Sequence, residues 1–370
     1  MKGANFNYLN FTLQKQGAIS LLQFRTGFAD TLEYIPLSEA LRNKNVSIRE
    51  VSESGSVNNL SLVNDSDHFI FISDGDILEG AKQNRVLNTS VFIAPHTVTE
   101  IPVSCVEAGR WRYRKKDFSH SKSYMPRDIR IEKMKKVEEN LFESGKAYAD
   151  QSEIWNEVRC YEDTLDSRSA SSDLNELFSK KEKELLELTG NLTYTEGSNG
   201  MAVFSGNRLI SVEIFNRAEI FREYFPKLLK STAIELLKAD INSQDISYEE
   251  SVRAAEEFMN ETEKINPKIH KGVGAGTEKR FSSDMLTGFE LNYDKKPVHF
   301  VALNENIRSQ KILRDRHGRA ILNFGKFKGY DLLTVYRMDR HYIQWLCFDA
   351  DIDTDLKREI YDEVLKFGRN

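Results

Sequence analysis

The chain has 370 residues, of which 40% are hydrophobic and 29% are charged, a balance typical of a globular protein rather than a disordered one. The net charge of −5 argues against a nucleic-acid coat or a membrane-surface binder that uses the whole chain, although local basic patches are compatible with it. No run approaches the roughly 18 apolar residues that a membrane span requires.

The first 120 residues are predicted to be rich in β-strands. Residues 69–72 form a continuous apolar run, as in a strand buried on both faces, and residues 91–93 form a second one. Apolar and other residues then alternate over 101–105, which is typical of a half-buried strand.

From residue 127 to about residue 260 the apolar spacing becomes helical. Asp173 is expected to cap a helix that follows a serine-rich loop, and a hairpin interrupts the helices at 201–214. Strands return near 285–303. The sequence therefore predicts an α+β body over 1–305, with a β-rich part at 1–120, a helical part at 127–260 and strands at 285–303.

The densest polar cluster lies between Asp74 and Trp111, around predicted strand ends. Arginine binds phosphate through two parallel hydrogen bonds, and side-chain amides can hydrogen-bond to the polar edge of a base or a sugar. A tryptophan ring can stack on a base. Glu79 and Glu107 are candidate catalytic acid/base groups. The candidate ligand-binding residues are Lys82, Gln83, Asn84, Arg85, Arg110 and Trp111.

An alternative interpretation of this cluster is purely structural. Polar residues at strand ends commonly form ion pairs, and Glu107 with Arg110 would then lock a turn.

Residues 272–276 have three alternating glycines, but outside a strand-to-helix turn this pattern favours a plain loop over a phosphate cradle. His299 lies on a predicted strand and is expected to be a hydrogen-bonded core residue.

Two blocks of this region resemble the signature of the ADP-ribosylglycohydrolase- and rhodanese/phosphatase-associated protein domain family. They are DGDILEGAKQNRVLN at 74–88 and IPVSCVEAGRW at 101–111, and the similarity extends over about residues 50–305. The resemblance implies a gene neighbourhood of ADP-ribose or nucleotide processing and of biological conflict. It supplies no catalytic residues.

The C-terminal part is expected to be a small separate α/β module at 320–370, after a basic linker at 306–319. The segments NFGKFKGY at 323–330 and DRHYIQWL at 339–346 resemble the C-terminal module of exonuclease X-like proteins over about residues 320–367. The nuclease of that family resides in a separate domain with acidic metal-binding motifs. That domain has an Asp-x-Glu pair, and Asp30 and Glu33 of this chain do not have its spacing. The resemblance therefore implies no nuclease activity here.

Between Lys311 and Arg340 the chain has eight Lys or Arg and three Asp residues, a local balance of 8 − 3 = +5. Aromatic residues interleave with these cations, a pattern typical of nucleic-acid binding. Phe324, Tyr342 and Trp345, however, are expected to form the core of the module. The candidate nucleic-acid-binding residues are Arg319, Lys326, Lys328, Arg337 and Arg340.

Three widely spaced cysteines indicate neither a disulfide framework nor a metal site, and the first residues lack the apolar stretch of a secretory signal, so we expect a cytoplasmic protein. No nucleotide-binding P-loop, zinc helix or serine-hydrolase elbow is present, and no cofactor is indicated.

The leading hypothesis is a nucleotide- or ADP-ribose-like ligand-binding protein with a nucleic-acid-binding module, in bacterial conflict or antiviral defence. The alternatives are a hydrolase or transferase acting on such a nucleotide, and a protein–protein interaction scaffold. Whether the chain catalyses a reaction, and how many copies assemble, stay open.

Overall fold

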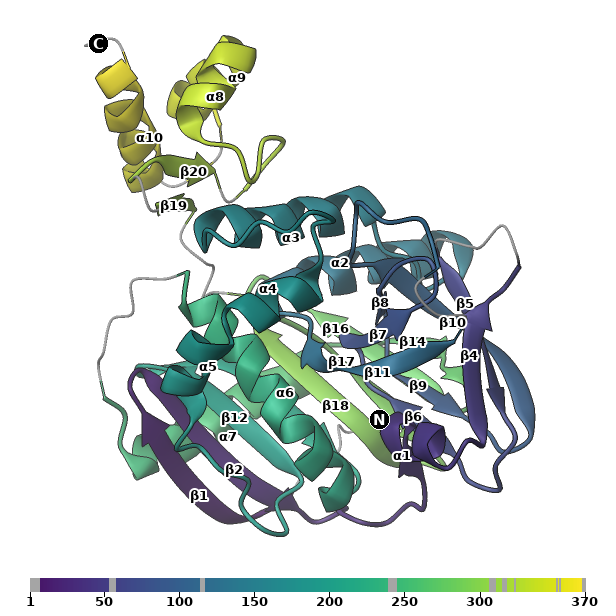
Figure 1. The fold of residues 1–370 in the computed structure, drawn as a ribbon. Coiled ribbons are helices and arrows are strands. Elements are labelled where there is room, and N and C mark those ends of the chain that lie inside the picture. Colours follow the sequence, from purple (N-terminus) through teal and green to yellow (C-terminus); the bar gives the residue numbers. More distant parts are fainter. Residues whose placement is uncertain are drawn as a thin grey trace.

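The structure, a computed structural model, is a mixed α+β fold (Figure 1). It describes residues 7–52, 58–113, 117–238, 245–305, 311–314, 318–322, 324–350, 352 and 354–367. Within these residues no helix is long and apolar enough to cross a membrane.

The largest sheet is antiparallel and joins strands from three distant parts of the chain, in the order β1-β2-β12-β13-β18-β17-β16-β14. Most residues of β2, β13 and β17 are buried, so these strands lose the in-and-out alternation of a half-exposed sheet. The strands are β1 Tyr8–Gln16, β2 Ile19–Thr26, β12 Gly200–Ser205, β13 Arg208–Phe215, β14 Lys268–Lys271, β16 Thr277–Ser282, β17 Leu286–Tyr293 and β18 Lys296–Asn304.

Two smaller sheets come mainly from the β-rich part of the chain. Their orders are β11-β7-β8-β10-β5-β4 and β15-β9-β6-β3. The expected strands at 69–72, 91–93 and 101–105 correspond to β6, β9 and the end of β10. The strands are β3 Ile35–Pro36, β4 Val46–Glu50, β5 Asn59–Asn64, β6 Ile70–Ile72, β7 Asp76–Gly80, β8 Arg85–Leu87, β9 Val91–Ile93, β10 Thr97–Cys105, β11 Phe118–Tyr124 and β15 Val273–Gly274.

Helices cover both faces of the large sheet. The long helix α6 shares a hydrophobic core with one face, and α7 packs on the other. Pro226 lies inside α6 without ending it, and the helix expected after Asp173 is divided at Lys181 into α4 and α5. The helices of the body are α1 Leu37–Arg42, α2 Arg127–Ser144, α3 Gln151–Thr164, α4 Leu174–Lys180, α5 Glu182–Thr189, α6 Ala218–Leu236 and α7 Tyr248–Lys264.

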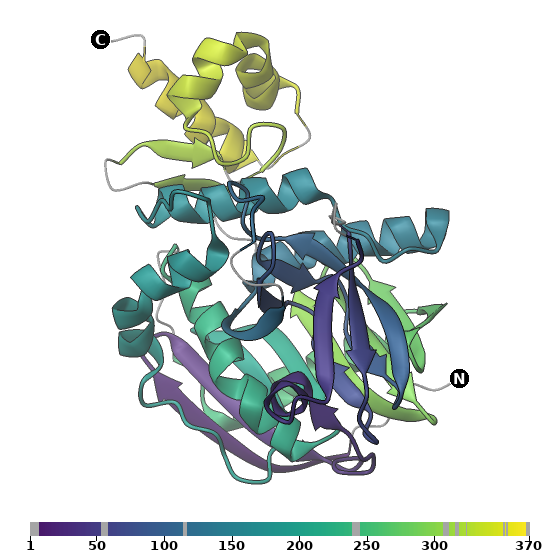
Figure 2. The ribbon, with the colours of Figure 1, turned by 45° about the vertical axis from the view of Figure 1, so that its right-hand side comes forward.

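The C-terminal residues form a module with its own hydrophobic core, seated on α3 (Figures 1 and 2). Ile312 belongs to this core and lies in a strand, so the module begins inside the segment that was expected to be a linker; 306–310 and 315–317 lie outside the described residues. The elements of the module are β19 Ile312–Arg314, β20 Ala320–Leu322, α8 Leu332–Met338, α9 Arg340–Phe348 and α10 Thr354–Phe367.

Candidate functional site

The two signature blocks meet in space as two turns. One turn joins β7 to β8, and the other follows β10, which pairs with β8. Glu107 accepts hydrogen bonds from Arg110 Nε at 2.7 Å and from the backbone N–H of Asn84 at 3.1 Å. Arg110 in turn donates to the backbone carbonyl oxygens of Ala81 at 2.6 Å and Gly80 at 3.2 Å. The ion pair therefore clamps one turn to the other.

Arg85 occupies a closed compartment beneath these turns. Its guanidinium is fully buried, lies 3.5 Å from Glu50 Oε1, and donates to Gln83 Oε1 at 3.3 Å and to the sulfur of Cys105. Gln83 also donates to the carbonyl oxygen of Glu107 at 2.7 Å. Burial raises the pKa of the Cys105 thiol to about 11, despite the nearby guanidinium, so this cysteine is a neutral part of the core.

The structure thus brings the candidate ligand-binding residues together but buries most of them. Lys82, Gln83, Asn84, Arg85, Glu107 and Arg110 are all buried. Buried polar groups usually find hydrogen-bond partners, and Gln83, Asn84, Glu107 and Arg110 find them in one another, in the backbone of the turns and in Asp173. Direct ligand contact by these residues stays a prediction.

Trp111 is the accessible residue of this set, with 49% of its surface exposed. The ammonium of Lys82 lies 5.2 Å from the centre of its ring and 5.4 Å from that of Tyr113. Glu79, the other candidate acid/base group, is partly buried on β7, where its backbone pairs with Ser119. Its catalytic role, like that of Glu107, stays a prediction.

The clamped turns hold a further segment, the serine-rich loop at 167–173. Asn84 Nδ2 donates to Asp173 Oδ2 at 3.0 Å, and the N–H of Gly109 donates to the carbonyl oxygen of Ser171 at 2.8 Å. A Cβ at Gly109 would lie 2.8 Å from the Cα of Ser171, so only glycine permits this approach. The signature therefore positions a loop that follows α3.

A second buried ionic network, which the sequence analysis did not predict, joins the turn between β6 and β7 to α2 and β13. Asp74 pairs with Arg130 at 3.1 Å and with Lys133, both on α2, and Arg130 also pairs with Glu213 on β13 at 3.0 Å. Burial opposes ionisation of Glu213, but Arg130 and His299 outweigh it and lower the pKa of this carboxyl to about 2.

His299 behaves as expected, since it is fully buried and its ring bonds to Ser90 Oγ at 2.8 Å and to Glu213 at 3.1 Å. Asp76 forms a separate buried cluster nearby, with Lys227 at 2.6 Å and His120 at 2.5 Å. The only local signal was Asp-Gly-Asp after a buried strand, because the partners come from distant elements. Among the described residues no group of three or more His, Cys, Asp or Glu could hold a metal ion.

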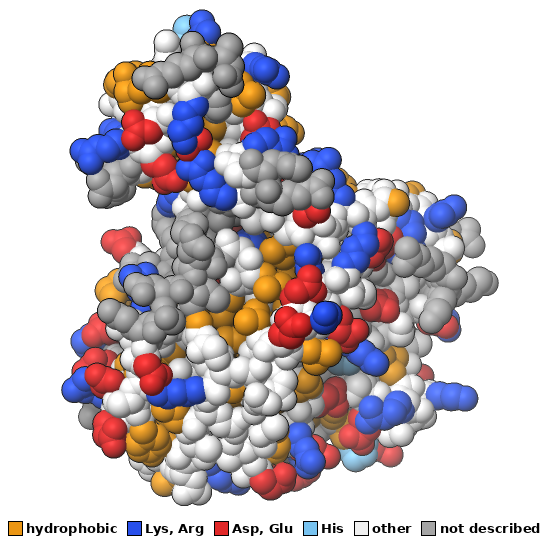
Figure 3. Space-filling view, turned by 60° about the vertical axis from the view of Figure 1, so that its left-hand side comes forward, with side chains coloured by type: hydrophobic (Ala, Val, Ile, Leu, Met, Phe, Trp, Pro, Cys, Tyr) orange, Lys and Arg blue, Asp and Glu red, His pale blue; other side chains and the backbone are white. Residues whose placement is uncertain are grey.

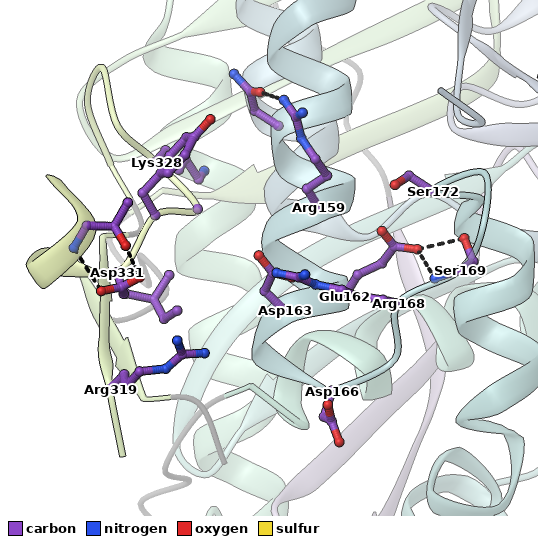
Figure 4. A pocket seen from close by; sticks show the side chains of 15 residues that line it. Arg159, Glu162, Asp163, Asp166, Arg168, Ser169, Ser172, Arg319, Lys328 and Asp331 are labelled. Atoms are coloured by element: carbon purple, nitrogen blue, oxygen red, sulfur yellow. Dashed lines mark hydrogen bonds and ion pairs between the residues drawn. The ribbon is translucent and has the colours of Figure 1, made fainter. Parts of the chain in front are cut away.

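An open cleft of about 660 Å³ lies between the body and the module. The body contributes α3 and the loop that the signature positions, and the module contributes β20 and the turn after it (Figure 4). The residues that line the cleft include Arg159, Glu162, Asp163, Asp166, Arg168, Ser169, Ser172, Arg319, Lys328, Tyr330 and Asp331.

The candidate residues of the module divide into two groups. Lys328 pairs with Glu157 of α3 and is mostly buried, while Ile321 packs on Cys160 of the same helix. Arg319 lines the cleft. The others are exposed, and Figure 3 shows Lys and Arg side chains spread over the surface of the module. These exposed candidates are Lys326, Arg337 and Arg340.

Comparison with known protein families gave a match for the body and none for the module. The model of the ARG and Rhodanese-Phosphatase-superfamily-associated Protein domain matches residues 10–303, a range that includes both signature blocks and ends before the module. Comparison with curated proteins and with solved structures gave no match. Because the match covers most of the chain, this protein belongs to the ARG and Rhodanese-Phosphatase-superfamily-associated Protein domain family.

Proposed function

We propose that this protein binds single-stranded nucleic acid through its C-terminal module. The observation that carries the proposal is a row of four aromatic rings along the turn at 324–330 and α9. The ring centroids of Tyr330 and Phe327 lie 6.2 Å apart, those of Phe327 and Tyr342 5.0 Å apart, and those of Tyr342 and Trp345 5.6 Å apart.

The two ends of the row are accessible to a ligand. Tyr330 is 42% exposed and Trp345 is 47% exposed, whereas Phe327 is buried in the core of the module. Unpaired bases stack on exposed aromatic rings largely irrespective of their sequence. The arrangement therefore favours a single strand over a duplex, whose bases are already stacked.

Cations accompany the rings. The Lys326 ammonium lies 4.8 Å from the ring centre of Phe327, and the Arg340 guanidinium lies 4.6 Å from that of Tyr336. The side chain of Lys326 is 64% exposed, and its ion pair with Asp339, at 3.2 Å, is weak enough for phosphate to replace it. Lys328 is assigned a different role, because its ammonium is committed to Glu157.

The test is the anisotropy of a fluorescein-labelled oligothymidylate at several salt concentrations. Substituting Arg337 and Arg340 by alanine should reduce the slope of log affinity against log salt by about 1.4, at about 0.7 per lost phosphate contact. Lys366→Ala, which removes an exposed lysine on α10, is the matched control. An unchanged slope in the double variant would refute the assignment of these arginines.

Stacking is tested separately at Trp345, whose exposure allows substitution without collapse of the module. Trp345→Ala should weaken binding by about 1–3 kcal/mol, whereas Trp345→Phe should retain most of it. Equal loss in both variants would exclude a stacking role.

A second candidate function, binding of a nucleotide- or ADP-ribose-like small molecule in a defence-related role, is favoured by the family of the body, whose description associates it with ARG and rhodanese–phosphatase proteins. Thermal-shift measurements with ADP-ribose, NAD and mononucleotides test it. No shift with any of these ligands would contradict it.

A further inference from the structure

The cleft between the body and the module has walls from three segments of the chain, and each wall carries an arginine. Arg159 lies on α3, Arg168 in the loop after it, and Arg319 immediately before β20. All three residues are exposed, and Figure 4 shows the side chain of Arg319 on the module facing those of α3. Guanidinium groups suit phosphate, which accepts their paired hydrogen bonds. Arg159 donates to Asn156 Oδ1 on the same helix, and it would turn from this amide to a phosphate in the cleft.

Four carboxylates line the cleft beside the three arginines and Lys328, namely Glu162, Asp163, Asp166 and Asp331, but two of them are engaged by protein donors. Glu162 accepts hydrogen bonds from the N–H and the hydroxyl of Ser169, at 2.9 and 2.7 Å. Asp331 caps α8, accepting from the N–H and the hydroxyl of Thr334 at 3.0 and 2.6 Å. Protein donors occupy Oε1 of Glu162 and both carboxylate oxygens of Asp331, so these carboxylates shape the walls.

Besides the exposed Asp166, the carboxylate that competes with a ligand is Asp163. It pairs with Arg168 at 2.5 Å, but the arginine side chain is 77% exposed. An ion pair in such solvent contact is worth little. Arg168 can therefore turn from Asp163 to a phosphate with a small loss of free energy.

The cleft also contains an aromatic face that connects it with the module. Tyr330 lines the cleft and is one exposed end of the aromatic row. A strand that stacks along this row leads towards the three arginines. The volume of about 660 Å³ lies within the range of about 300–1,000 Å³ that is usual for small-molecule sites.

We propose that this cleft binds the phosphate group of a nucleotide whose base stacks on Tyr330. Arg159 and Arg319 hold the phosphate from opposite walls. The nucleotide comes either from solution or from a strand on the module, and in the second case the inference rests on the proposed function. A phosphate site in the cleft explains why the family signature holds the serine-rich loop by hydrogen bonds, since that loop forms part of the cleft wall.

The experiment uses the full chain and the double variant Arg159→Ala/Arg319→Ala. Both residues are exposed, so the fold should be retained, and Arg222→Ala, an exposed arginine of α6, is the matched control. Isothermal titration with adenosine 5′-monophosphate tests the free nucleotide, and adenosine serves as the phosphate-free probe. Anisotropy with the oligothymidylate tests the strand.

If the cleft takes a free nucleotide, adenosine monophosphate binds more tightly than adenosine, and the double variant weakens it at least about tenfold. If it takes a nucleotide of the strand, the double variant instead lowers the salt slope of oligothymidylate binding by about 0.7, the value for one lost phosphate contact. The inference is overturned if the wild type does not bind adenosine monophosphate and the double variant binds the strand normally. Strand binding that still depends on Arg337 and Arg340 would then leave the proposed function intact.

Discussion

Replacing Glu107 by glutamine separates a structural role of this residue from a catalytic one. The carboxylate is fully buried and accepts from Arg110, from the N–H of Asn84 and from the hydroxyl of Ser171. Glutamine has nearly the same shape but directs an amide donor at this set of donors. It therefore leaves the Arg110 charge buried without its counterion.

Breaking a buried ion pair by removing one partner costs about 3–5 kcal/mol. The expected loss is at the lower end of this range, because Arg110 keeps its bonds to the carbonyl oxygens of Ala81 and Gly80. Urea unfolding followed by circular dichroism should show a lower midpoint with an unchanged slope. Glu176→Gln is the matched control, because it removes the same charge from an exposed ion pair with Lys180 and should cost less than about 0.5 kcal/mol.

A loss below about 1 kcal/mol in the Glu107 variant would refute this reasoning. It would mean that backbone carbonyls alone satisfy Arg110. The Glu107 carboxylate would then be dispensable for the clamp, and selection for chemistry would be the better explanation of its position.

Three further predictions concern the network, the turn and the docking of the module. Because the pKa of Glu213 is lower in the folded chain, this carboxyl is protonated at a higher pH in the unfolded chain than in the folded one. The ionised Glu213 therefore contributes about 3 kcal/mol of stability above pH 4.5, and this contribution should be lost as the pH falls to 2. Glu213→Gln should make the free energy of unfolding depend less on pH between 4.5 and 2. Gly325→Ala should weaken oligonucleotide binding, because the new Cβ overlaps the hydroxyl of Tyr342 and displaces this ring of the aromatic row. Gly318→Ala has the same positive φ but lies in open space, so it should cost only about 1 kcal/mol in a thermal melt and leave binding unchanged. Lys328→Met removes the ion pair with Glu157, so it should release the module from α3 and increase the radius of gyration in X-ray scattering. Lys326→Met, in the same turn, is the control and should leave the radius unchanged. Equal radii for the two variants would show that apolar contacts alone hold the module.

Local pattern was sufficient to predict the type of many elements. The change to helical spacing at Arg127 coincides with the start of α2, and the hairpin at 201–214 corresponds to β12 and β13. Asp173 caps a helix as predicted, by accepting a hydrogen bond from the N–H of Asn175. These features depend on side chains within a few residues of one another.

Local pattern could not reveal the accessibility of the charged residues. Arg85 has the same side chain as Arg159, yet Arg85 is enclosed by β4, β8 and β10 whereas Arg159 faces the cleft. The Asp74 network was equally hidden, because its partners Arg130 and Lys133 lie more than fifty residues away in the chain.

The sequence by itself determined the periodicities, the caps and the position of the polar cluster around strand ends. Only the tertiary structure decided which charges pair with one another and which remain open to solvent. The physical reason is that the free energy of a charged side chain depends on its burial and on its counterions, and both are set by segments that are distant along the chain.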